Sequence, residues 1–324
     1  MFAWIKKEWF LTGMLVAVIL GALFSEFGKR GGILHLELIT QWGIALIFFL
    51  HGVSLSPQAI KKGIKNMPLH IATQCGTWVL YPLLWVVFGG IMLNSFPQPL
   101  AFGFCYLFVL PSTISSSVAL TAIGGGNVPG AVFNASLSSL LGVFLTPFLI
   151  QFFLSVSGVR IEILPTIISI IQLLIVPMVL GQILRSRLVD FVKQHKNITS
   201  KVDKVVILLI VFSAFADSVA HGIWRHFNLS TLIFSFILCC AILFFITWFL
   251  TKVAHLLGFN LPDEIAMVFC GTKKTLAAGI PMAQVIFDGN PHLGMILVPI
   301  MLYHPTQIFY CTILANRYAK KVKL

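Results

Sequence analysis

Charged residues are scarce in this chain of 324 residues, at 10% of the total, whereas soluble globular proteins carry about 25%. Apolar residues make up 58%, and the mean hydropathy is +0.97. This composition excludes an ordinary soluble protein and predicts an integral membrane protein.

Extended polar stretches are also lacking. The longest polar connection between two apolar runs covers residues 185–204, which leaves no segment for a separate soluble domain. We therefore expect a single, all-α transmembrane domain over residues 1–324.

Motifs for metal binding and catalysis are missing too. The six cysteines lie within apolar runs, with no C-x-x-C pair and no histidine at metal-ligand spacing. The connections carry no paired carboxylates, no Ser-His-Asp spacing and no Gly-rich phosphate loop. We therefore expect no enzymatic activity, no metal and no cofactor.

Apolar runs of about 20 residues, the length that crosses ~30 Å of hydrocarbon, occupy nearly the whole chain. The ten predicted spans are Phe10–Phe27, Ile33–Val53, Leu69–Leu93, Leu100–Ile123, Val128–Ser155, Ile163–Leu184, Val205–Trp224, Leu232–Val253, Ile265–Phe287 and Leu293–Ala315. The first run is longer than the apolar part of a signal peptide and is not followed by a small-residue cleavage site. We therefore expect it to be the first span and not a removed signal peptide.

Basic residues are distributed unevenly between the two sides of these spans. Sixteen of the 22 lie on one side: Lys6, Lys7, Lys61, Lys62, Lys65, Arg185, Arg187, Lys193, Lys196, Lys201, Lys204, Lys252, Arg317, Lys320, Lys321 and Lys323. Four lie on the other side: Lys29, Arg30, Arg160 and Arg225. The positive-inside rule then predicts cytoplasmic termini in a multi-pass protein of the cytoplasmic (inner) membrane. The basic residues behind the net charge of +12 lie mainly in the loops expected to face the anionic inner leaflet. This distribution argues against nucleic acid as a partner.

Two predicted spans contain polar clusters at mid-membrane depth. In the fourth, Pro111 precedes a group of hydroxyl residues: Ser112, Thr113, Ser115, Ser116 and Ser117. In the ninth, Gly271 precedes a second polar group: Thr272, Lys273, Lys274 and Thr275. Both spans end at Gly-Asn, and both are fourth in a set of five. We therefore predict two inverted repeats, approximately 10–155 and 163–315, whose broken helices meet near the midplane.

The lysine pair is the strongest functional signal. Each lysine costs roughly 2.5 to 3.5 kcal/mol at the centre of an inserted helix, so Lys273 and Lys274 need a compensating role. With nearby hydroxyl donors and free backbone N–H groups, they predict a site for an anion such as a carboxylate, sulfate or phosphate. Packing of Ser and Thr between helices is the alternative for the hydroxyls. Adjacent residues point ~100° apart on a helix, so we expect one lysine to face a cavity and the other to bind carbonyls or hydroxyls.

Three other ionisable residues lie in or next to the predicted spans. Asp217 is either an intramembrane ion-pair or proton-carrying group, or an acid near the water interface. His304 either titrates near neutral pH or is a hydrogen-bonded structural residue beside Pro305. Glu264 begins the ninth span and is interpreted as a first-turn acid.

The ten-span layout, the Pro-x-x-x-x-Ser-Ser-Val pattern and the Gly-Asn exit resemble the bile acid:sodium symporter superfamily. The sequence from Phe269 to Ala277, FCGTKKTLA, is similar to its YfeH-like branch, which also holds the seventh vertebrate member of solute carrier family ten. The resemblance covers essentially the whole chain. It implies a secondary transporter with an elevator-like or rocking motion. It also implies a core domain of two crossing broken helices beside a panel domain of the first, second, sixth and seventh spans.

The resemblance also implies ion-site residues. Ser116 and Ser117 match a fourth-span Ser-Asn pair, Ser139 matches a fifth-span hydroxyl ligand, and Gln74 matches a third-span glutamine. In the ninth span, where sodium-coupled members have Glu and Gln, this chain has Val268 and Thr272. At about 4 Å, an effective dielectric of roughly 20 gives ~4 kcal/mol of repulsion between a lysine and a sodium ion.

The sequence therefore predicts a secondary carrier of a small organic or inorganic anion, in which the lysine pair replaces one or both sodium sites. Proton coupling remains open, because buried lysines can titrate. Two alternatives are a non-transporting regulator or scaffold on a transporter fold and a sodium-coupled, bile-acid-like symporter. The expected partners are the anionic substrate and the lipid bilayer, and the sequence sets no oligomeric state.

Overall fold

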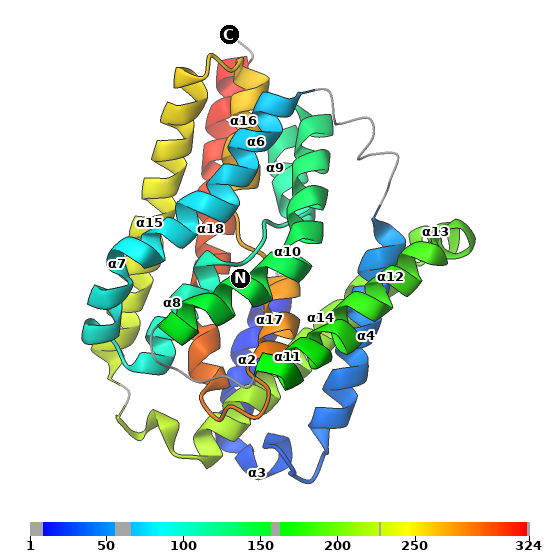
Figure 1. Ribbon diagram of the computed structural model, residues 1–324, viewed down its shortest axis with the longest axis vertical. Helices are drawn as coiled ribbons and strands as arrows, with labels where there is room; N and C mark the ends of the chain where they lie inside the picture. Colours follow the sequence, from blue (N-terminus) through cyan, green and yellow to red (C-terminus); the bar gives the residue numbers. More distant parts are fainter. Residues whose placement is uncertain (1–8, 56–65, 157–162, 227, 323–324) are drawn as a thin grey trace. The chain divides into compact units, whose positions relative to one another are not determined.

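The computed structural model describes residues 9–55, 66–156, 163–226 and 228–322 (Figure 1), and within these ranges every regular element is a helix. They divide into two compact units. Of the basic residues that predict the orientation, seven lie outside the described residues: Lys6, Lys7, Lys61, Lys62, Lys65, Arg160 and Lys323.

The first unit combines helices from three parts of the chain. They are α2 (Trp9–Leu23), α3 (Ser25–Gly28), α4 (Leu36–Ser54), α11 (Ile163–Ile170), the π-helix η2 (Ile171–Ile175), α12 (Val176–Ile183), α13 (Arg185–Gln194), α14 (Lys196–Ala220), the 3-10 helix η3 (Ile223–His226) and α17 (Leu276–Ile286). Glycines allow α4 and α12 to pack closely: a Cβ at Gly52 would overlap the Met178 carbonyl, and one at Gly181 would overlap the Phe49 carbonyl. Small residues at such contacts are typical of membrane helices.

The polar connection at residues 185–204 is helical. It forms α13 and the first turns of α14. The periodicity of Leu188, Phe191 and Val192 explains this, because residues at i, i+3 and i+4 share one helix face. The polar connection between the apolar runs is therefore an amphipathic helix followed by the first turns of a spanning helix.

The second unit contains the rest of the described helices, with α18 from residue 298 onward. They are α6 (Met67–Cys75), the π-helix η1 (Gly76–Leu80), α7 (Tyr81–Ser95), α8 (Gln98–Phe108), α9 (Ser115–Ile123), α10 (Val128–Val156), α15 (Leu229–Leu256), α16 (Leu261–Gly271) and α18 (Leu293–Val322). Helix α16 lies at the centre of this unit, where it contacts α6, α9, α10 and α15 and is buried from Asp263 to Gly271.

Two helices of this unit stop within the membrane-embedded part of the chain. The segment 109–114 separates α8 from α9, and Figure 1 shows it as a non-helical segment between these helices. The segment 272–275 likewise follows α16. Proline at position 111 has no N–H group to continue a helix, and a Cβ at Gly271 would lie only 2.6 Å from Leu250 Cδ1.

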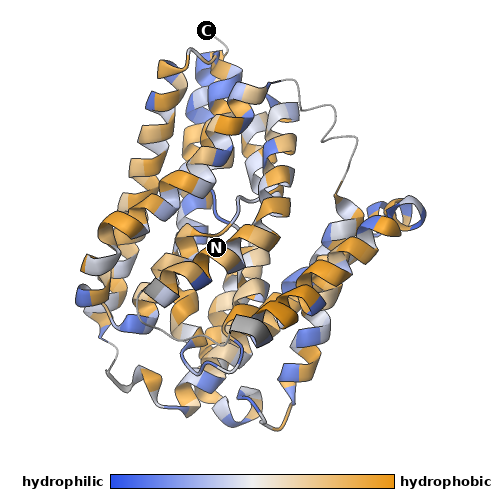
Figure 2. Cartoon of the chain, in the orientation of Figure 1, coloured by the Kyte–Doolittle hydropathy of each residue, from blue (hydrophilic) through white to orange (hydrophobic). Residues whose placement is uncertain are grey.

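The outer surface is rich in large apolar side chains. Leu256, Trp42 and Phe309 are 85%, 78% and 72% exposed, and apolar residues predominate along α15 and α12 (Figure 2). Within the described residues, six helical stretches are long and apolar enough to cross a membrane: Leu36–Ser54, Met67–Ser95, Val128–Ser155, Pro165–Ile183, Leu229–Leu256 and Leu293–Val322. Shorter apolar helices cover Trp9–Leu23 and Gln98–Phe108. Such exposed apolar surfaces fit a lipid environment.

Candidate functional site

The interruption after α8 frees four consecutive backbone carbonyls, and each accepts a hydrogen bond. Lys274 Nζ donates to Phe108 O at 3.0 Å and to Leu110 O at 2.7 Å. Thr146 Oγ1 donates to Val109 O at 2.6 Å. The Thr275 N–H donates to Pro111 O at 2.9 Å. The two non-helical segments therefore lie against each other and satisfy each other's backbone, as irregular structure at membrane depth requires.

Lys274 is the centre of this arrangement. Its side chain is fully buried, and its Nζ donates a third hydrogen bond to Thr77 O at 3.2 Å. The Tyr81 ring centroid lies 4.0 Å from the same nitrogen. We call the three carbonyl oxygens of Thr77, Phe108 and Leu110 the carbonyl cage. All three ammonium protons have an acceptor there, which matches the three donors of a lysine.

The π-helix η1 supplies one oxygen of this cage. It interrupts the third predicted span at residues 76–80, and Thr77 lies within it. A π-helical turn disturbs the regular i to i−4 pairing, and such turns are frequent at functional sites. The carbonyl of Thr77 is thereby presented to Lys274 rather than used only within its own helix.

The backbone of residues 272–275 is held by side chains from neighbouring helices. Gln307 on α18 accepts from the Lys274 N–H at 2.9 Å and donates to Lys274 O at 2.8 Å. The hydroxyls of Tyr81 and Tyr303 both donate to Thr272 O, at 2.5 and 3.0 Å. The two hydroxyls are also 2.6 Å apart. The interruption is therefore a defined structure with paired groups.

Lys273 has a different environment from its neighbour. Its side chain is fully buried, and its Nζ has no hydrogen-bond partner among the described residues. The groups within electrostatic range are Cys270 on α16 and Cys311 and His304 on α18. Burying an ammonium group without a partner costs several kcal/mol, so this position favours a transient anionic or hydrogen-bonding ligand.

The predicted hydroxyl group forms its own cluster at the start of α9. Thr113 Oγ1 lies 2.7 Å from Ser116 Oγ and 2.8 Å from Ser117 Oγ. Ser112 Oγ lies 3.5 Å from Ser117 Oγ, and Ser115 is exposed. The hydroxyls of Ser112, Thr113, Ser116 and Ser117 contact one another, and among the described residues none of them forms a hydrogen bond with the side-chain nitrogen of Lys273 or Lys274.

On α10, Ser138 contacts the interrupted segment, although the predicted residue was its neighbour Ser139. Ser138 Oγ accepts from the Ser112 N–H at 2.9 Å, whereas Ser139 is half-buried. One residue along a helix turns the side chain by about 100°. The contact to the interrupted segment thus comes from Ser138.

Gln74 belongs to a polar network between α6 and α10. Its Nε2 donates to the backbone and side-chain oxygens of Asn134 at 3.0 and 3.2 Å. Asn134 Nδ2 lies 3.0 Å from His70 Nδ1, and Trp78 Nε1 donates to Gln74 Oε1 at 3.1 Å. This network fixes α6, and with it the helix that carries Thr77.

Two acids at the start of α16 also have partners. Asp263 accepts from Asn127 Nδ2 at 2.6 Å and from Asn66 Nδ2 at 2.9 Å. Glu264 accepts from Tyr318 at 2.8 Å and lies 2.9 Å from His255 Nε2. Acids in a first turn are stabilised by the helix dipole. The Gly-Asn pair that ends the fourth predicted span therefore connects α9 to the start of α16.

Two other predicted residues lie apart from the cage. Asp217 lies in the first unit, where it accepts from the Arg30 N–H at 3.1 Å and lies 3.8 Å from His221 Nδ1. His304 lies in the second unit, where its Nδ1 is 3.0 Å from Gln307 Nε2. His304 is thus connected to the backbone of Lys274 through the side chain of Gln307.

Several residues of the site escaped prediction. Tyr81, Tyr303 and Gln307 were not among the predicted site residues, and Thr77 contributes through its backbone. The only available signal was the small group of polar side chains around Gln307, with His304 and Thr306 beside it.

Comparisons with known proteins identify the family of this chain. Residues 8–320 match the model of the SBF-like CPA transporter family. YfeH of Escherichia coli is 39% identical over 313 residues, which cover 96% of this chain and 93% of YfeH. Sodium/bile acid cotransporter 7 of Danio rerio is 32% identical over 314 residues, which cover 96% and 93% of the two chains. The protein of the same name from Mus musculus is 31% identical over 312 residues, or 95% and 92%. This chain therefore belongs to the SBF-like CPA transporter family, a family of multi-pass membrane transporters and not of enzymes.

Proposed function

We propose that this protein is a secondary active transporter that carries a small organic or inorganic anion by alternating access, with the lysine pair in place of one or both sodium sites. The observation that carries the proposal is the carbonyl cage around Lys274, in which one buried ammonium holds three backbone oxygens at 2.7 to 3.2 Å. Carbonyls of unwound helix segments are the groups that coordinate sodium in many transporters.

Lys274 acts as a permanent internal cation. An ammonium group that already fills the oxygens of a cation site removes the need for sodium there and repels a second cation by ~4 kcal/mol at about 4 Å and an effective dielectric of roughly 20. Transport is therefore independent of sodium. An inward proton gradient is the alternative driving force, and Lys273, His304 and Asp217 are the candidate proton carriers.

Lys273 binds the transported anion. Its ammonium group is buried and has no hydrogen-bond partner among the described residues. An anion that enters when the site opens can therefore form an ion pair with it. The hydroxyls of Ser112, Thr113, Ser115, Ser116, Ser117, Thr272 and Thr275 are proposed as additional donors, together with Gln74, Ser139 and Gly271 as structural or ion-site positions. Full burial of Lys273 in this conformation fits a closed state of an alternating-access cycle.

The proposed architecture has ten spans in two inverted repeats of one transmembrane domain, with a core domain and a panel domain. The division of the helices supports it in part. The first unit includes the first, second, sixth and seventh predicted spans, and the second unit contains both interruptions, but the first unit also includes residues 277–297 from the ninth and tenth spans. Both termini are proposed to be cytoplasmic in the inner membrane, because the basic residues predict that orientation.

Uptake into proteoliposomes tests the proposal. Purified protein is reconstituted and offered labelled carboxylates, sulfate and phosphate under an inward sodium gradient, an inward proton gradient, or neither. We expect uptake of at least one anion without sodium and its loss in Lys273→Met. Uptake that depends strictly on sodium favours the coupling named in the vertebrate relatives, and no uptake of any anion favours a regulatory role.

A further inference from the structure

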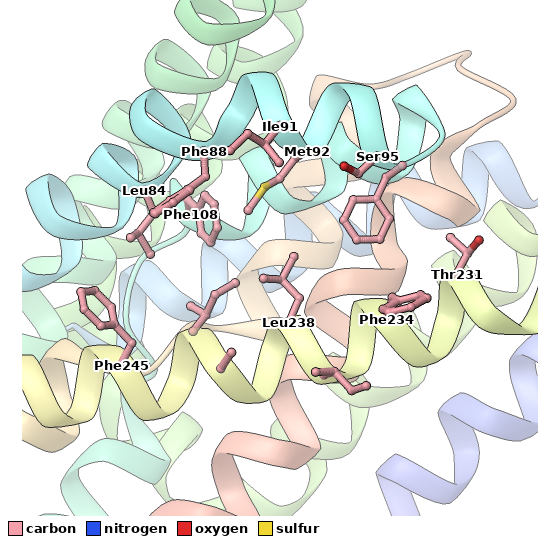
Figure 3. Close-up of a pocket in the computed structure, with 14 residues that line it drawn as sticks. Leu84, Phe88, Ile91, Met92, Ser95, Phe108, Thr231, Phe234, Leu238 and Phe245 are labelled. Atoms are coloured by element: carbon pink, nitrogen blue, oxygen red, sulfur yellow. The ribbon is translucent and has the colours of Figure 1, made fainter.

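A long apolar groove lies between α7 and α15 in the second unit (Figure 3), with a volume of about 740 Å³. Its floor is formed by Met92, Ile242 and Phe108, which are 5%, 6% and 0% exposed. Phe88 and Phe234 stand at its open side, 45% and 63% exposed. The depth of the groove distinguishes it from the ordinary lipid-facing surface of a helix.

The groove is long enough to hold an acyl chain across one leaflet of a membrane, and only one of its ends is polar. On α15 it runs from Thr231 to Phe245, which at 1.5 Å per residue is about 21 Å, against ~15 Å for half of the hydrocarbon core. The hydroxyls of Ser95 and Thr231 lie at one end, and Leu84 and Phe245 lie at the other (Figure 3). The polar end therefore belongs near the membrane surface and the apolar end near its middle.

The lining restricts the occupant. None of the 14 residues that line the groove is charged, so a buried anionic group would lose its hydration without a partner. A peptide segment would bring backbone amides into a wall that offers few hydrogen bonds. A flexible hydrocarbon chain with a polar group at one end meets both conditions.

We infer that this groove binds one acyl chain of a membrane phospholipid, with the ester region beside Ser95 and Thr231. The bound chain packs against Phe108, whose carbonyl oxygen accepts the hydrogen bond from Lys274 Nζ at 3.0 Å. Occupancy of the groove therefore supports the last turn of α8 and, through it, the carbonyl cage. The groove is a lipid site that is separate from the proposed anion site.

Filling the groove with protein tests this inference. Two variants, Ala241→Trp and Leu238→Trp, each place an indole ring in the space that the acyl chain would occupy. Ile233→Trp is the matched control, because Ile233 lies on the same helix, is 51% exposed and does not line the groove. Native mass spectrometry in mild detergent should show one retained phospholipid per wild-type chain. In both groove variants we expect the affinity for that phospholipid to fall about tenfold or more, the factor lost with roughly two methylene contacts.

A second measurement remains informative if a groove variant folds poorly. Wild-type protein stripped with a harsher detergent should melt at a lower temperature and recover when phosphatidylethanolamine or phosphatidylglycerol is added back. The control variant should recover equally, and folded groove variants should not respond. The inference is overturned if wild type retains no phospholipid, if it retains a free fatty acid instead, if a second copy of the chain covers the groove in a dimer, or if the tryptophans leave lipid retention unchanged.

Discussion

The two helix interruptions of the second unit use opposite chemistry. The segment around Pro111 presents oxygen atoms, namely the carbonyls of residues 108–111 and a cluster of hydroxyls. The segment 272–275 presents nitrogen donors, the Thr275 N–H and the Lys274 ammonium. Each interruption therefore satisfies part of the other, and side chains of neighbouring helices, among them Thr146 and Gln307, satisfy further backbone groups.

The lysine pair shows a second contrast between immediate neighbours. Lys274 has a full set of acceptors, whereas Lys273 has none among the described residues. We therefore propose that one lysine serves the structure and that the other binds a ligand. The following changes test this division, in order of their expected effect on stability.

Lys274→Met should have the largest effect. It leaves three buried carbonyls without a donor, and loss of one partner from a buried charged contact typically costs about 3 to 5 kcal/mol. Unfolding by denaturant or heat in detergent measures the change. Lys193→Met is the control, because its side chain is 69% exposed and should change stability by less than about 0.5 kcal/mol. Equal stability of the two variants would show that the cage does not hold the interruptions together.

Lys274→Ala should acquire a response to sodium. Without the ammonium, the carbonyl cage is an empty oxygen site, and sodium at about 100 times its dissociation constant should restore ~2.7 kcal/mol. Thermal unfolding in sodium chloride and in choline chloride at equal ionic strength measures this response. Wild type should not distinguish the two salts, and a sodium shift in wild type would contradict the proposed replacement.

Gln307→Leu should have an intermediate effect. It removes both hydrogen bonds to the Lys274 backbone and leaves a buried N–H and C=O unpaired, which costs about 1 to 3 kcal/mol per group. Thr306→Ala is the control, since that hydroxyl donates to Leu302 O of its own helix at 2.7 Å and makes no other hydrogen bond among the described residues. A variant as stable as the control would mean that water replaces the amide.

Tyr81→Phe and Tyr303→Phe should each cost about 1 kcal/mol. Because both hydroxyls meet at Thr272 O, the double variant should show a coupling energy of roughly 0.5 kcal/mol or more. A double-mutant cycle on unfolding free energies measures it. Strictly additive losses would mean that the two tyrosines act independently.

Lys273→Met should have the smallest effect on stability and the largest on transport. Removal of a buried, unpartnered ammonium leaves no acceptor unpaired, so the free energy of unfolding should stay within about 1 kcal/mol or rise. Anion uptake should be abolished in the same preparation. A destabilisation as large as that of Lys274→Met would assign both lysines to the structure.

The sequence allowed prediction of the parts of this site that carry a local signal. Two lysines in an apolar run and a proline before a hydroxyl cluster stand out by charge and by backbone chemistry alone, and both interruptions occur at those positions. The membrane class followed from composition, and the family followed from the FCGTKKTLA motif.

The remaining parts depend on three-dimensional contacts. The oxygen of Thr77 belongs to the backbone of a π-helix, which no side-chain pattern reveals. Tyr81 and Tyr303 are 222 residues apart in sequence, and each is an ordinary apolar residue of its span. The one-residue offset between Ser139 and Ser138 shows a further limit, because alignment by resemblance does not resolve the rotation of a helix.

The carbonyl cage consists only of main-chain oxygens. Side chains on α6 and α8 can change during evolution without altering its chemistry, provided that the helices keep their course. Under the proposed function, the cation that these oxygens hold is therefore set by residue 274 alone and not by the residues that carry the oxygens.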